Sequence, residues 1–269
     1  MMAIEIRDLS YRYHDGTEAL KEIFLKVEKN RKVAILGANG SGKTTLLMHL
    51  NGLLAAQTGF VSIFGETITK KNLQNIRQKV GILFDNPDNQ LFSTSVFDDV
   101  AFGPYNMGFS ESEIKQRTHD ALTLVGICHL AEKPPHNLSL GQKKKAAIAG
   151  LLSMDMELYA MDEPFSGLDP QSVDEFFGIL NGLYQRGSTL IISTHNVDLA
   201  YSWADEIFVL KDGQCVASGA YDLLRDETLM KESRLRIPTL TRIFEETEFR
   251  PRNPQEATNC LRNMKNSRK

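Results

Sequence analysis

The sequence predicts an α/β fold in which helices cover the faces of a parallel sheet. The run Val33–Leu36 is short, continuous and apolar, as expected of a strand buried on both faces. Further along, a strand over residues 158–161, a helix over about 171–184 and a strand over 189–193 follow one another. Strands that alternate with helices are typical of parallel sheets.

The N-terminal part predicts two strands before the buried run. An alternating apolar pattern over residues 4–9 is followed by the turn residues Asp15 and Gly16. A second strand is expected over about 23–27. After the buried run comes a glycine-rich turn, and then a helix over about 43–53.

The middle of the chain predicts a mainly helical section over about residues 90–150. Ser110 and Glu113 have the spacing of a capping box, which opens a helix. This helix is expected to run to about Val125, and Gly126 is the residue type that ends helices.

Composition limits the function classes. The chain has 269 residues, of which 42% are hydrophobic, so it can form one large domain or a domain with a small appendage. The net charge of -3 disfavours nucleic acid as a partner. Cys128, Cys215 and Cys260 lie far apart, which predicts free thiols in a reducing cytosol. No run approaches the ~20 apolar residues of a membrane span, so we expect any membrane role to depend on partners.

Residues 37–44 read Gly-Ala-Asn-Gly-Ser-Gly-Lys-Thr and match the phosphate-binding motif GxxxxGKS/T. Gly40 and Gly42 let the backbone bend so that successive N–H groups converge on phosphate oxygens. The helix that begins near Lys43 adds the positive end of its dipole, and the Thr44 hydroxyl is placed to bind Mg²⁺. The predicted nucleotide-binding residues of this loop are Gly37, Ala38, Asn39, Gly40, Ser41, Gly42, Lys43, Thr44 and Thr45. The motif alone fits kinases, GTPases, motors and transporters.

Asp162 and Glu163 follow the apolar strand at 158–161. Adjacent acidic residues are commonly surface charge, but at the end of a buried strand we favour a functional interpretation. Asp162 would hold Mg²⁺, directly or through water. Glu163 would polarise the attacking water as the general base.

The run Leu138–Gln142 reads Leu-Ser-Leu-Gly-Gln and resembles the Leu-Ser-Gly-Gly-Gln signature of ABC ATPases. An apolar-periodic segment follows it, so Ser139 and Gly141 are expected at a helix N-terminus, where anions bind. Together with Gln142 they form a second predicted nucleotide-binding element.

Three further features extend this resemblance. Residues 166–169, Ser-Gly-Leu-Asp, resemble the D-loop through which two subunits of the family communicate. His195 follows the strand at 189–193 and matches the switch histidine that contacts the γ-phosphate. Tyr13 occupies the place of the aromatic residue that stacks on adenine, and Tyr11 is the competing choice.

The resemblance to the ABC ATPase family covers about residues 1–225 and implies a P-loop NTPase with a mixed sheet, an antiparallel β subdomain and a helical subdomain. It implies ATP and Mg²⁺ as cofactors, with Glu163 and His195 as the catalytic residues. It also implies a head-to-tail homodimer, in which the phosphate loop of one copy and the signature of the other enclose each ATP. Residues 226–269 are expected to form a C-terminal accessory segment.

A finer resemblance is to the ATPases of energy-coupling-factor importers, and among these to the cobalt-uptake ATPases. It is carried by Phe84–Phe92, Ala101–Pro104 and Gly141–Gly150. It implies a transmembrane coupling protein and a substrate-binding membrane subunit as partners, at the cytoplasmic face of the cell membrane. Nickel, biotin or another vitamin stays open as the cargo. The apolar residues expected to receive helices of the coupling protein are Leu91, Phe92, Val96 and Phe97.

The chain departs from the family pattern at two important positions. Asp85 stands where the family has a glutamine that meets Mg²⁺ and the attacking water. The aspartate is charged and shorter by one methylene, so we expect it to meet the metal over a different reach or through water. The change puts the tightness of coupling between nucleotide and membrane partner in doubt. Leu140 replaces the first glycine of the signature, and we expect this change to be tolerated.

Two other classes compete with a transporter subunit. A DNA-repair ABC ATPase would carry long coiled coils between loop and signature, and a translation factor would carry two ATPase domains. A P-loop kinase or GTPase would lack the signature and the switch histidine. The sequence favours neither class.

Overall fold

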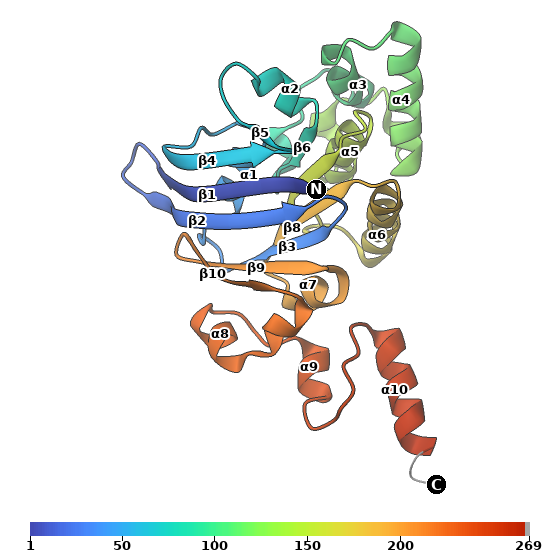
Figure 1. Ribbon diagram of the computed structural model, residues 1–269. Helices are drawn as coiled ribbons and strands as arrows, with labels where there is room; N and C mark the ends of the chain where they lie inside the picture. Colours follow the sequence, from blue (N-terminus) through green and yellow to red (C-terminus); the bar gives the residue numbers. More distant parts are fainter. Residues whose placement is uncertain (267–269) are drawn as a thin grey trace.

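The computed structural model describes residues 1–266 and contains two sheets and helices grouped around them (Figure 1). One sheet has four strands in the order β2-β1-β4-β5, and the other has six in the order β10-β9-β3-β8-β7-β6. The strands are β1 (Met2–Arg12), β2 (Glu18–Glu28), β3 (Lys32–Leu36), β4 (Thr58–Ile63), β5 (Glu66–Thr67), β6 (Val80–Leu83), β7 (Leu158–Asp162), β8 (Thr189–Thr194), β9 (Glu206–Lys211) and β10 (Gln214–Gly219). The α-helices are α1 (Lys43–Leu50), α2 (Leu73–Arg77), α3 (Val96–Asn106), α4 (Glu111–Leu124), α5 (Leu140–Leu152), α6 (Pro170–Gln185), α7 (Val197–Trp203), α8 (Glu227–Glu232), α9 (Thr239–Ile243) and α10 (Pro254–Asn266).

The six-stranded sheet determines where the functional loops meet. β3 pairs in parallel with β8 and β9, and β7 pairs in parallel with β6 and β8, while β10 is antiparallel to β9. The carboxyl ends of β3, β6, β7 and β8 therefore share one edge, where open α/β sheets bind ligands. The predicted mixed sheet and antiparallel subdomain are confirmed, although the sequence reasoning found neither β4 and β6 nor β9 and β10.

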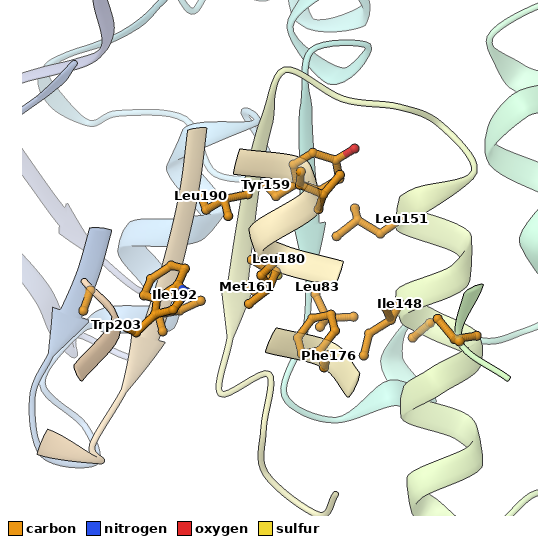
Figure 2. Packing of buried hydrophobic residues seen from close by; sticks show 14 of the residues in the cluster. Leu83, Ile148, Leu151, Tyr159, Met161, Phe176, Leu180, Leu190, Ile192 and Trp203 are labelled. Carbon is orange, nitrogen blue, oxygen red and sulfur yellow. The ribbon is translucent and has the colours of Figure 1, made fainter. Parts of the chain in front are cut away.

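Strand β7 shows why the large sheet is buried on both faces. Leu158 and Ala160 belong to a core shared with the four-stranded sheet and α1. Tyr159 and Met161 point the other way, because successive side chains of a strand alternate. They join a second core under the helices, where Leu151 of α5 also packs (Figure 2). A strand with two apolar environments gives a continuous apolar sequence rather than an alternating one.

The helical section contains α3, α4 and α5, which contact one another. Both predicted N-termini are confirmed. Ser110 caps α4 in a capping box with Glu113, and Ser139 caps α5 in a second capping box with Gln142. After α4 the backbone turns at Gly126, whose φ of 73° favours glycine.

The C-terminal segment leaves the six-stranded sheet after β10 and continues through α8, α9 and α10, at the end of the molecule away from α3 and α4 (Figure 1). Arg252 anchors it, since its guanidinium donates to the carbonyls of Tyr201 and Ala204 and stacks over Tyr221. The predicted boundaries, 1–225 with helices at about 90–150 and a segment at 226–269, stay a prediction. Residues 267–269 of that segment lie outside the described residues. Within residues 1–266, no helix combines the length and apolar character that a membrane crossing needs.

Candidate functional site

The loop between β3 and α1 forms the predicted phosphate-binding cradle. Its backbone needs glycine at two positions, since φ is 79° at Gly40 and 103° at Gly42. A Cβ on Gly42 would lie 2.5 Å from the carbonyl oxygen of Ala19, so a larger residue would displace the neighbouring β-strand. The first N–H groups of α1 have no partner inside the helix and are available to an anion.

Lys43 is buried at the start of α1. Its Nζ donates to the carbonyl oxygens of Gly37 at 2.8 Å and Ala38 at 3.2 Å. Burial lowers the pKa of Lys43, and the nearby carboxylates of Glu163 and Asp162 oppose that shift. Within residues 1–266, the buried Oγ of Ser41 has no hydrogen-bond partner. An unpaired hydroxyl beside a lysine and a helix N-terminus fits a phosphate group.

Two of the three predicted magnesium residues, Thr44 and Asp162, lie in contact, and the third, Asp85, lines the cavity over the cradle. The hydroxyl of Thr44 donates to Oδ2 of Asp162 at 2.5 Å, and the hydroxyl of Ser193 donates to Oδ1. The described residues contain no group of three or more His, Cys, Asp or Glu side chains able to hold a metal ion. The Thr44 hydroxyl and the Asp162 carboxylate nevertheless fit Mg²⁺, because this ion is commonly held by one or two protein oxygens together with phosphate and water.

Glu163 and His195 form the predicted catalytic pair. One oxygen of the Glu163 carboxylate lies 2.8 Å from Nδ1 of His195 and accepts from the backbone N–H of His195 at 3.0 Å. The other oxygen accepts from the hydroxyl of Thr194 at 3.1 Å. The end of β8 therefore fixes the Glu163 carboxylate, which follows β7, as a general base requires.

Lys144 is a site residue that sequence reasoning missed. Its Nζ donates to the carbonyl oxygen of Glu163 at 2.7 Å and pairs with Oδ1 of Asp85 at 3.4 Å. Burial lowers the pKa of Lys144, and the charge of Asp85 is the largest opposing effect. Helical spacing in the sequence could have indicated that Lys144 is buried, since Lys144 shares a helix face with the buried residues Ala147 and Leu151.

Tyr13 and Tyr11 are now distinguished by position. The hydroxyl of Tyr13 lies 3.0 Å from Oγ1 of Thr45, and Tyr13 lines the cavity over the cradle. Tyr11 packs edge-on against the Tyr13 ring and the ring of His49, with centroid distances of 5.1 and 4.9 Å. The residue expected to stack on adenine is therefore the one at the cavity.

The cavity brings together most of the predicted residues, but not the signature. Asn39 also lines an adjoining cavity with Ala38 and His195. Asn86 and Asn89 line the main cavity and were not predicted individually. The predicted residues that line the main cavity are Tyr13, Asn39, Gly40, Ser41, Gly42, Lys43, Thr44, Thr45, Asp85, Asp162 and Glu163.

The signature residues lie elsewhere, at the start of α5. Ser139 and Gln142 occupy its first turn and hydrogen-bond each other, as described above. Leu140 is exposed, and its side chain lies against Gly167 of the predicted D-loop. None of Ser139, Gly141 and Gln142 lines the cavity over the cradle. The two predicted anion-binding elements are thus separate within one chain.

A family model described as "ABC transporter" matches residues 20–166, which span the cradle, the signature and the Asp162–Glu163 pair. The chain belongs to the ABC transporter family. ATP hydrolysis is the activity of its ATP-binding cassettes, so the predicted ATPase activity is confirmed, while the roles of the individual site residues stay predictions.

Similar ABC proteins cover nearly the whole chain. The energy-coupling factor transporter ATP-binding protein of Carboxydothermus hydrogenoformans is 46% identical over 97% of this chain and 98% of its own length. A protein of the same name from Methanosphaera stadtmanae is 48% identical over 91% of this chain and 89% of its own. The first of these matches therefore includes most of the accessory segment.

Two solved ABC structures are also similar. The structure of cbiO1 from Clostridium perfringens, described as part of the ABC transporter complex cbiONQ, has a TM-score of 0.73 and 40% identity, covering 91% of this chain and 99% of that one. A dimeric post-hydrolysis structure of the cassette MJ0796, bound to ADP and phosphate, has a TM-score of 0.75 and 25% identity, covering 81% and 98%. The predicted ABC ATPase fold is confirmed.

Proposed function

We propose that this chain is the ATP-hydrolysing subunit of an energy-coupling-factor importer. The single observation that carries the hydrolytic role is the Glu163 carboxylate, held by Thr194 and His195 beside the cradle. The names of the similar proteins from two organisms support the importer role.

Nucleotide binding follows from the cavity. The Tyr13 ring stacks on the adenine, and Lys43 exchanges its backbone carbonyl partners for phosphate oxygens. Thr44 and Asp162 would hold Mg²⁺, with Asp85 as the third predicted oxygen donor. When bound, Mg²⁺ supplies charge neutralisation at the phosphates. The cradle residues from Gly37 to Thr45 orient the triphosphate by their N–H groups.

Hydrolysis depends on the residues at the ends of β7 and β8. Glu163 accepts the proton of the attacking water as general base. His195 contacts the γ-phosphate and keeps the Glu163 carboxylate oriented through the 2.8 Å contact at Nδ1. The ends of β7 and β8 are paired with each other, so the base is placed before the nucleotide arrives.

The functional unit is a head-to-tail homodimer. Ser139, Gly141 and Gln142 of one copy contact the nucleotide held by the cradle of the other. The separation of the two elements within one chain supports this arrangement. Because both half-sites have their catalytic residues, a second copy is a sufficient partner. The dimer closes around ATP and opens after hydrolysis, and this movement is transmitted to the membrane subunits.

The membrane partner docks beside α3. A cavity there is lined by Leu91, Phe92 and Phe102. Phe92 is 67% exposed and packs edge-on with Phe102 at 4.8 Å between centroids. These rings receive a short helix of the transmembrane coupling protein.

The expectation that Val96 receives a helix of the coupling protein was wrong, because Val96 is fully buried in the core at the first turn of α3. Phe97 is also directed to that core and only partly exposed.

Cobalt is the proposed cargo, delivered by a substrate-binding membrane subunit while this chain stays at the cytoplasmic face of the membrane. The support is the similarity to cbiO1. Nickel or a vitamin such as biotin is the alternative, because the nucleotide site does not contact the cargo. Metal-stimulated uptake by the assembled complex distinguishes these cargoes.

The hydrolytic role is tested with Glu163→Gln in the purified chain. We expect this variant to bind Mg-ATP, to dimerise with it, and to lose ~10²-fold or more in turnover, since the amide cannot accept the proton. Light scattering with and without Mg-ATP reports the dimer, and phosphate release reports turnover. Turnover near the wild-type rate, or a variant that stays monomeric with Mg-ATP, would refute the proposal.

A further inference from the structure

Lys144 has an environment that is unusual for a lysine. Its side chain is only 2% exposed, although it lies in a run of three lysines. Lys143 and Lys145 of that run pair with Asp88 and Glu175 nearer the surface. A buried ammonium is unfavourable unless charged and polar groups compensate it. The groups that compensate Lys144 therefore define its role.

The Lys144 ammonium joins three segments that are far apart in the sequence. Lys144 belongs to α5, its carbonyl partner Glu163 follows β7, and its carboxylate partner Asp85 follows β6. All three residues thus meet at the carboxyl edge of the large sheet. Asp85 also begins the segment that leads to Phe92 and the apolar cavity beside α3.

The backbone of Glu163 requires such support. Its φ is 41°, in the left-handed region that non-glycine residues adopt rarely and at a cost. The Glu163 N–H donates to the carbonyl oxygen of Ser193, and Lys144 donates to the Glu163 carbonyl oxygen. These two bonds hold the two peptide groups that flank the Glu163 Cα.

We propose that Lys144 is a positioning residue for hydrolysis, which holds the Glu163 backbone in its left-handed conformation and links it to Asp85. This rests on the proposed function, in which Glu163 is the general base. Lys144 does not touch the reacting atoms. It keeps the Glu163 carboxylate between Thr194 and His195, and through Asp85 it connects the base to the segment beside the membrane-docking cavity.

The first test compares Lys144→Met with Lys143→Met in the full chain. Lys143 ties the same segment to the same helix through Asp88, at 2.7 Å, but has no contact with Glu163. We expect Lys144→Met to lower kcat ~10- to 100-fold, with the Kd for a fluorescent ATP analogue changed less than about threefold. Lys143→Met should keep kcat within about threefold of wild type.

Melting curves and kcat per nucleotide-binding site are measured in parallel. A purely structural role would lower Tm and the number of binding sites and leave kcat per site unchanged, which would overturn the proposal. Wild-type kcat in a folded Lys144→Met variant would also overturn it. Should that variant fail to fold, Lys144→Leu, which also removes the donor, is judged by the same criteria.

The second test is a double-mutant cycle with Asp85→Asn. If Asp85 acts through Lys144, its substitution should change kcat several-fold in the wild type and at least about twofold less in the Lys144→Met background, where only its predicted role at Mg²⁺ remains. Additive effects would overturn the link to Asp85. Glu163→Gln separates the two proposals. If Glu163→Gln is inactive while Lys144→Met has wild-type kcat, only the positioning role of Lys144 fails. If Glu163→Gln is active, the general-base role of Glu163 itself fails.

Discussion

The hydroxyl of Thr44 donates to Oδ2 of Asp162 at 2.5 Å, although 118 residues separate them in the chain. Thr44 lies at the start of α1 after β3, and Asp162 ends β7, with β8 between these two strands in the sheet. The contact therefore spans two strand spacings at the carboxyl edge. It brings together the two oxygen donors that a magnesium ion would share with the nucleotide phosphates.

Thr44→Val removes the hydroxyl at nearly constant volume. We expect kcat for ATP hydrolysis to fall ~10- to 100-fold and the Mg²⁺ concentration for half-maximal activity to rise, because one of two protein oxygens is lost. Titrating Mg²⁺ at saturating ATP measures both effects. Thr44→Ser keeps the hydroxyl and should recover most of the activity. An unchanged Mg²⁺ dependence in the valine variant would contradict the assignment of this residue.

Replacing Phe92 and Phe102 together by serine should weaken the attachment of membrane partners and leave ATP binding of the isolated chain unchanged. The reason is that the two rings supply the exposed apolar surface of the cavity beside α3. Co-purification of membrane proteins with the tagged chain measures attachment.

Tyr105→Ser is the matched control for these rings. Tyr105 belongs to α3, as Phe102 does, and is more exposed than Phe92, but it does not line the cavity. Equal loss of membrane partners from the control and the double variant would show that general surface apolarity, rather than this cavity, holds them.

Tyr159 gives a prediction for alkaline pH. Burial raises the pKa of Tyr159 to about 12, and its hydroxyl oxygen accepts from the backbone N–H of Met156 at 2.9 Å. Between about pH 10 and pH 12 the unfolded chain loses this proton while the folded chain keeps it, so the free energy of unfolding falls as pH rises. The contribution is fully present below pH 10 and amounts to about 2–3 kcal/mol.

Comparison with Tyr159→Phe isolates this single group. The variant is expected to be ~1–3 kcal/mol less stable at neutral pH, because it leaves the Met156 N–H unpaired. Denaturant unfolding at pH 8 to 11 measures the difference between the two proteins. That difference should shrink as pH rises above 10, and a difference that is constant with pH would contradict the raised pKa.

The phosphate loop could be predicted from the sequence because its physics is local. Gly40 and Gly42 adopt positive φ within a turn that a strand enters and a helix leaves, and Ser139 caps its helix through a residue three positions on. Neighbours in the chain supply these contacts, so the residue types alone indicate the geometry. The carboxylates Asp162 and Glu163 were predictable for a related reason, since they end a strand whose burial is visible in its composition.

The packing of segments distant in the chain decided which of the other side chains are buried at the site and which are exposed. Lys144 stands in a basic run that resembles a solvated surface, and only the approach of β6 and β7 to α5 makes it a buried partner of Asp85 and Glu163. Val96 and Phe92 are similar in apolar character and four residues apart, yet one is core and the other is exposed. Periodicity in the sequence indicates which face of a helix or strand is apolar. The residues that cover that face are remote in the chain, and their contacts determine which groups are removed from water.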